Sequence, residues 1–69
     1  MNVLNVSVNG ESRELATGTT LDTLVADLTA AATGVAAAVN EAVVPRSQWS
    51  GTLLGNGDRV EVLTAVQGG

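Results

Sequence analysis

The hydrophobic residues of this chain change their spacing once near the start, and this change limits the possible folds more than any other feature. Residues 2–8 place Leu4, Val6 and Val8 on one side, which is the period-two pattern of a half-buried strand. Asn9-Gly10 follows directly, and this dipeptide favours a type I′ turn because both central residues then need positive φ. The sequence therefore predicts an opening hairpin with strands at residues 2–8 and 11–16.

From residue 20 onward the spacing becomes that of a helix. One amphipathic stripe is formed by Leu21, Leu24, Val25 and Leu28. Thr19 or Thr20 is expected to cap the first backbone N–H groups, and Asp22 suits the positive end of the helix dipole. Gly34 is expected to be the left-handed residue that ends the helix. These signals predict a helix over about residues 20–32.

The remaining segments predict short strands. Residues 35–39 are small and apolar with a β-branched residue at each end, as in a strand in the middle of a sheet. Pro45 has no N–H to donate, so the strand at 43–44 is expected to be short and at an edge. A turn at Gly55–Asp58 precedes a last strand over residues 58–66. The resulting order is ββαββ, with a possible fifth strand.

A helix with a single apolar stripe needs one large apolar surface to cover. In a chain of 69 residues that surface is one face of a mixed sheet, and there is no room for a second core. The prediction is therefore a single α+β domain spanning residues 1–69, a roll in which the helix lies across four or five strands. Its core is aliphatic, because the chain has one Trp and neither Phe nor Tyr.

The composition excludes most self-contained active sites. The chain has no Cys, His or Lys, so it lacks a thiol nucleophile, an imidazole base, a Schiff-base amine and the usual soft metal ligands. Three Arg against seven acidic residues give a net charge of −4, which argues against nucleic acid as a partner. Neither a signal peptide nor a membrane-spanning segment is recognised, and a cytoplasmic protein is expected. We predict that the chain is not an enzyme and binds no metal or cofactor.

The C-terminal pair Gly68-Gly69 is the candidate for chemistry. The α-carboxylate of Gly69 is ionised at neutral pH and is a poor electrophile, so a partner enzyme that uses ATP would have to adenylate it. A sulfur nucleophile could then replace oxygen at the same carbon. Glycine narrows the chain end, and residues 66–69 are predicted to be a flexible tail. The partner is expected to hold this tail through Val66, Gln67 and Gly68.

Other motifs favour structural roles. The spacing in Gly55–Asp58 is not that of a phosphate-binding loop, and no helix follows it, so a turn is the better interpretation. Trp49 could belong to an exposed contact patch with Pro45 and Arg46, but closure of one end of the core is favoured.

The string NEAVVPRSQW, followed by GNGDRVEVLTAVQGG, resembles the ThiS sulfur carriers of bacterial thiamin synthesis, which are small ubiquitin-like β-grasp proteins. The resemblance covers essentially the whole chain. Its most specific part is Val43-Val44-Pro45-Arg46 with Trp49 three positions on, together with the Gly57-Asp58 turn and the terminal Gly68-Gly69.

The resemblance implies a function in which Gly69 is adenylated by a ThiF-type enzyme that uses ATP. Gly69 then becomes a thiocarboxylate, with sulfur from a cysteine-derived persulfide, and gives that sulfur to the thiazole ring on a ThiG-type thiazole synthase. Partners are expected to bind the exposed sheet face near the last strand, although the sequence leaves open which of Arg59, Glu61 and Leu63 points outward. Three alternatives remain: the small subunit of molybdopterin synthase, a ubiquitin-like protein modifier, and a plain binding module.

Overall fold

The opening hairpin forms as the sequence predicts. The computed structural model describes residues 2–30 and 33–64, and its first two strands are β1 (Val3–Val8) and β2 (Glu11–Ala16). They pair antiparallel from Val8 opposite Glu11 to Val3 opposite Ala16. Asn9 and Gly10 both have positive φ, at 51° and 86°. The turn therefore has the geometry that favours Asn-Gly.

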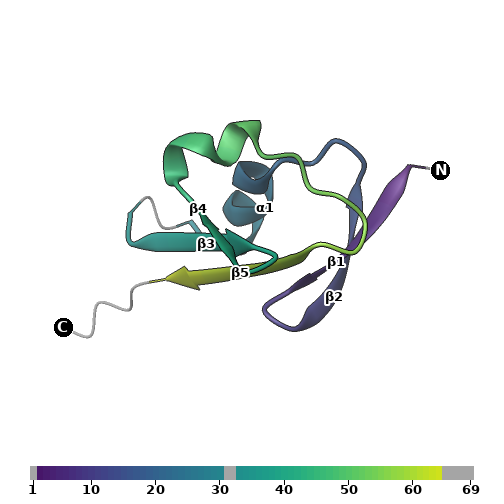
Figure 1. Cartoon of the computed structure of the whole chain (residues 1–69), viewed down its shortest axis with the longest axis horizontal. Helices are drawn as coiled ribbons and strands as arrows, with labels where there is room; N and C mark the ends of the chain where they lie inside the picture. Colours follow the sequence, from purple (N-terminus) through teal and green to yellow (C-terminus); the bar gives the residue numbers. More distant parts are fainter. Residues whose placement is uncertain (1, 31–32, 65–69) are drawn as a thin grey trace.

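The sheet has five strands in the order β2-β1-β5-β3-β4 (Figure 1). The later strands are β3 (Val35–Val39), β4 (Ala42–Val44) and β5 (Arg59–Thr64). The last strand lies between the two hairpins, parallel to β1 and antiparallel to β3. This mixed sheet with one helix confirms the predicted α+β roll, and the short strand before Pro45 lies at an edge, as expected.

The helix α1 (Leu21–Leu28) is shorter than the predicted 20–32. Thr29 already has an extended backbone, with φ −152° and ψ 145°. The apolar stripe ends at Leu28, and Thr29 and small alanines follow it, so a further turn would bury little additional surface. Gly34 does have the expected positive φ, 72°, but it lies beyond the end of the helix and does not cap it.

The start of α1 is capped differently from the expectation. Thr20 is the N-cap residue, but its side chain makes no hydrogen bond to a backbone N–H of the helix. Its hydroxyl donates to the carboxylate of Asp22 instead. The backbone N–H of Leu21 donates to the carbonyl of Thr52 over 2.9 Å, so the loop before β5 anchors the beginning of the helix.

A short 3₁₀ helix, η1 (Arg46–Gly51), follows Pro45 and was not predicted. It places Trp49 in the core with 5% of its surface exposed. The indole Nε1–H donates to the carbonyl of Val44 over 2.8 Å, which satisfies the polar end of the buried ring. The favoured interpretation of Trp49 as a core residue is therefore confirmed.

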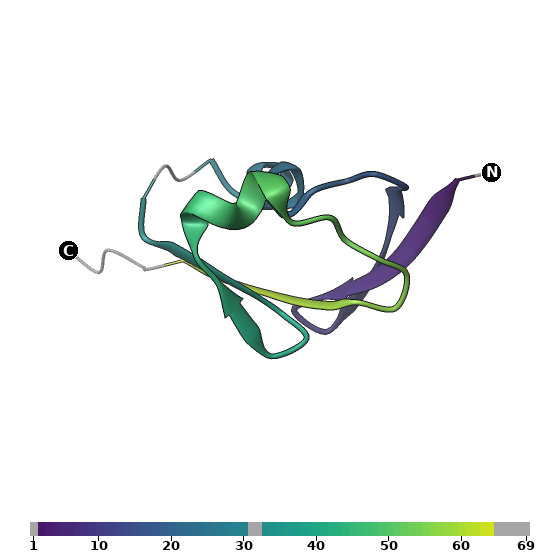
Figure 2. The same ribbon diagram turned by 45° about the horizontal axis from the view of Figure 1, so that its top comes forward.

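The core lies between α1, η1 and one face of the sheet. In Figures 1 and 2 both helical segments lie on the same side of the sheet. Buried hydrophobic residues come from every layer: Leu4, Val6, Val8, Leu21, Leu24, Val25, Ala37, Trp49, Leu54, Val60 and Val62. No described element covers the other face of the sheet, which is therefore the available surface for contact with another protein.

Candidate functional site

The strand β5 leads to the predicted reactive end and is the natural starting point for the site. The predicted site residues Val66, Gln67, Gly68 and Gly69 lie outside the described residues, as does the last part of the strand predicted over 58–66. Their roles, the boundary of the domain at 1–69 and the tail at 66–69 remain predictions. The structure does describe the strand that carries them, up to Thr64.

Alternation along β5 answers the question of which side chains point outward. Val60 and Val62 are buried against the core, at 0% and 7% exposure. Arg59, Glu61 and Leu63 alternate with them and are exposed, so all three lie on the uncovered face of the sheet. The sequence could not decide this, because a shift of one residue in register moves every side chain to the opposite face.

An apolar patch occupies this uncovered face beside the end of β5. We call Ala36, Ala38, Val43 and Leu63 the open-face patch. In the strand register, Ala36 lies opposite Leu63, and Ala38 lies opposite both Glu61 and Val43. Leu63 and Val43 are 70% and 76% exposed. The four residues line a shallow hollow of ≈ 280 Å³ together with Ala37, Glu41 and Glu61.

Sequence reasoning found only the β5 part of this patch. The missed contributions come from β3 and β4, where Ala36, Ala38 and Val43 lie on the outward face. A period-two interpretation of residues 35–39 would have separated Ala36 and Ala38 from the inward-facing positions. The small apolar residues on both faces of β3 concealed that alternation.

Charges around the open-face patch are mainly negative. Glu61 lies within the hollow, and Glu41 borders it from the turn before β4. The guanidinium of Arg59 pairs with the Glu41 carboxylate over 2.8 Å, with 53% and 78% of the two side chains exposed. Exposed ion pairs of this kind contribute little to stability. The patch therefore offers an apolar centre with an acidic border to a partner surface.

The described residues contain no assembled active site. Among residues 2–30 and 33–64 no polar or charged residue is buried, and no three acidic side chains are grouped so that they could hold a metal ion. In the same ranges no helix is long and apolar enough to cross a membrane.

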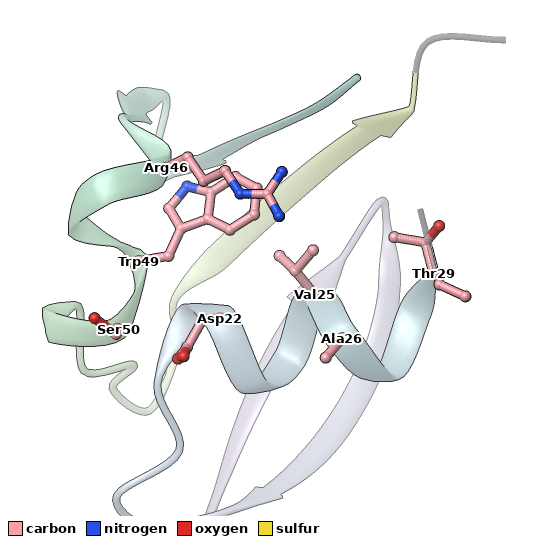
Figure 3. Close-up of a pocket in the computed structure, with 8 residues that line it drawn as sticks. Asp22, Val25, Ala26, Thr29, Arg46, Trp49 and Ser50 are labelled. Carbon is pink, nitrogen blue, oxygen red and sulfur yellow. The ribbon is translucent and has the colours of Figure 1, made fainter. Parts of the chain in front are cut away.

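A second hollow of ≈ 410 Å³ lies between α1 and η1, on the helical side of the molecule (Figure 3). The Arg46 guanidinium stacks over the Trp49 ring, 5.4 Å from its centroid. Asp22 and Ser50 also line the hollow, but Asp22 accepts the hydrogen bond from Thr20 at the start of the helix. Each of these interactions lies within one helical segment, Arg46 with Trp49 in η1 and Thr20 with Asp22 at the start of α1.

The Gly55–Asp58 segment is a turn, as predicted. The carboxylate of Asp58 accepts from the backbone N–H of Gly55 over 2.7 Å, and the Asp58 N–H donates to the Gly55 carbonyl over 3.1 Å. The Asp58 side chain and backbone thus close the turn on Gly55. The segment fixes the entry into β5.

Comparison with known proteins places this architecture in a family. A model of the ThiS family matches residues 6–69. The sulfur carrier protein ThiS of Escherichia coli (strain K12) is 29% identical over 66 residues, which cover 96% of this chain and all of the relative.

A solved structure agrees with the sequence match. The crystal structure of the thiamine biosynthesis protein ThiS from Geobacter metallireducens superposes with a TM-score of 0.79 at 30% identity, covering 96% of this chain and all of the other. The relative's fold, its length and the family match up to Gly69 agree with the resemblance found in the sequence. The chain belongs to the ThiS family and has its β-grasp fold.

Proposed function

We propose that this protein carries sulfur on the carboxyl group of Gly69 and donates it to the thiazole ring in thiamin biosynthesis. Membership of the ThiS family makes it a small carrier protein and not an enzyme, as the sequence predicts. The observation that carries the proposal is the family match over residues 6–69, which includes the terminal Gly68-Gly69. The match to ThiS proteins favours this carrier over the molybdopterin synthase subunit and over a protein modifier.

The proposed chemistry takes place in three steps at the carboxyl group of Gly69. First, a carboxylate oxygen of Gly69 attacks the α-phosphorus of ATP and pyrophosphate leaves, which produces an acyl adenylate. A cysteine persulfide then attacks the carbonyl carbon and AMP leaves. A second thiol finally attacks the cysteine sulfur of the resulting acyl disulfide, which forms a disulfide with that cysteine and releases the thiocarboxylate. ATP is consumed in the partner's site, and we propose that the carrier itself binds no cofactor.

The structure supports a role in which this chain carries the sulfur and partner enzymes carry out the reactions. In the described ranges no polar side chain is buried and no group of acidic residues could hold a metal ion, and we propose that the partner enzymes supply the chemistry. We propose that a ThiF-type adenylating enzyme and a ThiG-type thiazole synthase both bind the open-face patch. This patch ends at Leu63, six residues before Gly69, so a bound partner could reach the carboxyl group. A partner with a basic border would complement Glu41 and Glu61. The cytoplasm remains the predicted location.

The test is adenylation of the full chain by a purified ThiF-type enzyme. Wild-type protein is expected to release pyrophosphate from ATP in proportion to the amount of carrier. A variant that lacks Gly69 should release none, and its amide NMR spectrum for residues 2–30 and 33–64 should match the wild type. Equal pyrophosphate release from the shortened chain would contradict the proposal.

A further inference from the structure

The strand β5 is bound to its parallel neighbour by very few main-chain pairs. Only Ser7 opposite Arg59 and Val8 opposite Val60 are paired between β1 and β5. After Val8 the chain turns away at Asn9-Gly10 into β2. The part of β5 that continues toward the C-terminus therefore runs past the end of β1 (Figure 1).

The side chain of Asn9 extends this ladder by one more step. Its Oδ1 accepts from the backbone N–H of Val62 over 2.9 Å, and its Nδ2–H donates to the Val62 carbonyl over 3.1 Å. The backbone N–H of Asn9 donates to the Val60 carbonyl over 2.9 Å. One asparagine thus binds both polar groups of the Val62 backbone, as a neighbouring strand would.

An equivalent contact holds the other end of the strand from the β3 side. The Oδ1 of Asn40 accepts from the Arg59 N–H over 2.9 Å, while the Asn40 N–H donates to the Arg59 carbonyl over 2.7 Å. Asn9 and Asn40 both have φ 51° and occupy the same position of a tight turn. Asn40 differs from Asn9 in that it holds the opposite end of β5, and its Nδ2–H donates to the Asp58 carboxylate over 3.0 Å.

We propose that Asn9 is a positioning residue for the reactive end: it fixes Val62 as the last point at which the β1 side of the sheet holds β5. This inference rests on the proposed function. Backbone groups of Asp58, Val60 and Val62 all face β1, and by the same alternation those of Thr64 face that side beyond the reach of Asn9. On the β3 side the pairing continues to Thr64, and the five residues after it give a reach of at most about 18 Å.

Fixing Val62 lowers the entropy that a partner must remove when it binds the chain end. β3 still pairs with β5 as far as Thr64 opposite Val35, so loss of the Asn9 contact loosens Val62 on its β1 side alone, and a partner must order that side again when it binds. Ordering one additional residue weakens binding by roughly fivefold. The chemical step itself occurs at Gly69 and does not involve Asn9. The inference therefore predicts an effect on KM for the carrier and none on kcat.

The variants Asn9→Gly and Asn40→Gly test this in the full-length chain. Glycine accepts the positive φ, so each variant removes the side-chain contacts and leaves the turn intact. In Asn9→Gly we expect the Val62 amide to exchange with solvent about tenfold faster, because it loses its hydrogen-bond acceptor. The KM in ThiF-type adenylation should rise roughly fivefold at constant kcat. Asn40→Gly should leave the Val62 exchange rate and the KM unchanged.

The amide of Leu24 in α1 reports on unfolding of the whole domain, because it donates within the helix to Thr20. If Leu24 and Val62 exchange faster by the same factor in Asn9→Gly, the effect is global and the inference is wrong. An unchanged KM in that variant would also overturn it.

Asn9→Asp retains the acceptor for the Val62 N–H but removes the donor to the carbonyl, and we expect it to raise the KM as well. Failure of wild-type adenylation would refute the proposed function, whereas the exchange rates test the positioning separately.

Discussion

The two faces of the sheet differ in composition and in what they do for the molecule. On the face covered by α1 and η1, Val60 and Val62 of β5 are buried. On the other face of the same strand, Glu61 and Leu63 are exposed beside the alanines of β3. A single strand thus contributes to the core with every second residue and to the candidate docking surface with the others. Stability and partner binding should therefore be separable by mutation of adjacent residues.

The largest effect is expected in the core of the covered face. Leu24 is 1% exposed and is among the largest fully buried side chains. Leu24→Ala should lower the free energy of unfolding by about 3 kcal/mol, because it removes buried methyl groups and leaves a cavity. Urea denaturation followed by circular dichroism measures this change. A loss below about 1 kcal/mol would mean that the covered face is less tightly packed than the structure shows.

Adjacent residues of β5 provide the sharpest comparison between the faces. Val62→Ala should cost about 2 kcal/mol of stability, since Val62 is 7% exposed and faces the core. Leu63→Ala should leave stability within about 0.5 kcal/mol, because Leu63 is 70% exposed.

The same two variants are expected to reverse their order in partner binding. Leu63→Ala should raise the KM for ThiF-type adenylation by about tenfold, as expected for an apolar interface residue that contributes strongly to the binding energy. Val62→Ala should have little effect on KM at a temperature where it is folded. Equal effects of both variants on KM would show that the open-face patch is not the docking surface.

The sequence predicted β1, the first turn and the start of α1 well, because local signals encode them. Alternation defined β1, Asn9-Gly10 defined the first turn, and the stripe from Leu21 defined α1. The predicted end of α1 was wrong, because Gly34 indicated a later one. The helix ends at Leu28, with Thr29 as its C-cap, because a further turn would bury little additional surface.

Features that depend on long-range contacts could not be predicted in this way. The contacts of Asn9 with Val62 and of Asn40 with Arg59 join residues far apart in the sequence. The open-face patch likewise requires the register of three strands. The candidate site at residues 66–69 came from the terminal glycines and the family resemblance, and its roles remain predictions.

A smaller effect is expected at the tryptophan that closes the covered face. Trp49→Phe removes the hydrogen bond from Nε1 to the Val44 carbonyl and should cost about 1 kcal/mol. Thermal unfolding measures the loss. The KM for adenylation should stay at the wild-type value at a temperature well below the transition, because Trp49 lies on the face opposite the open-face patch. A raised KM with unchanged stability would instead favour Trp49 as a contact residue.

The smallest effect concerns the border of the open face. Glu41 has φ 72°, a left-handed conformation that disfavours side chains with a Cβ. Glu41→Gly should stabilise the protein by about 0.5 kcal/mol, since relief of the strain exceeds the loss of the exposed ion pair with Arg59. Differential scanning calorimetry should detect a higher transition temperature. A lower one would mean that the ion pair contributes more than exposed pairs usually do.

We propose that the carboxyl group of Gly69 is the group that reacts and that the rest of the chain takes no part in the chemical steps. Mass spectrometry tests it after incubation with ATP, a ThiF-type enzyme and a persulfide sulfur source. Cleavage after Arg59 releases the terminal peptide 60–69. We predict that this peptide alone gains the mass of one sulfur replacing one oxygen. Sulfur found in any other peptide, or no sulfur in the terminal one, would contradict the account.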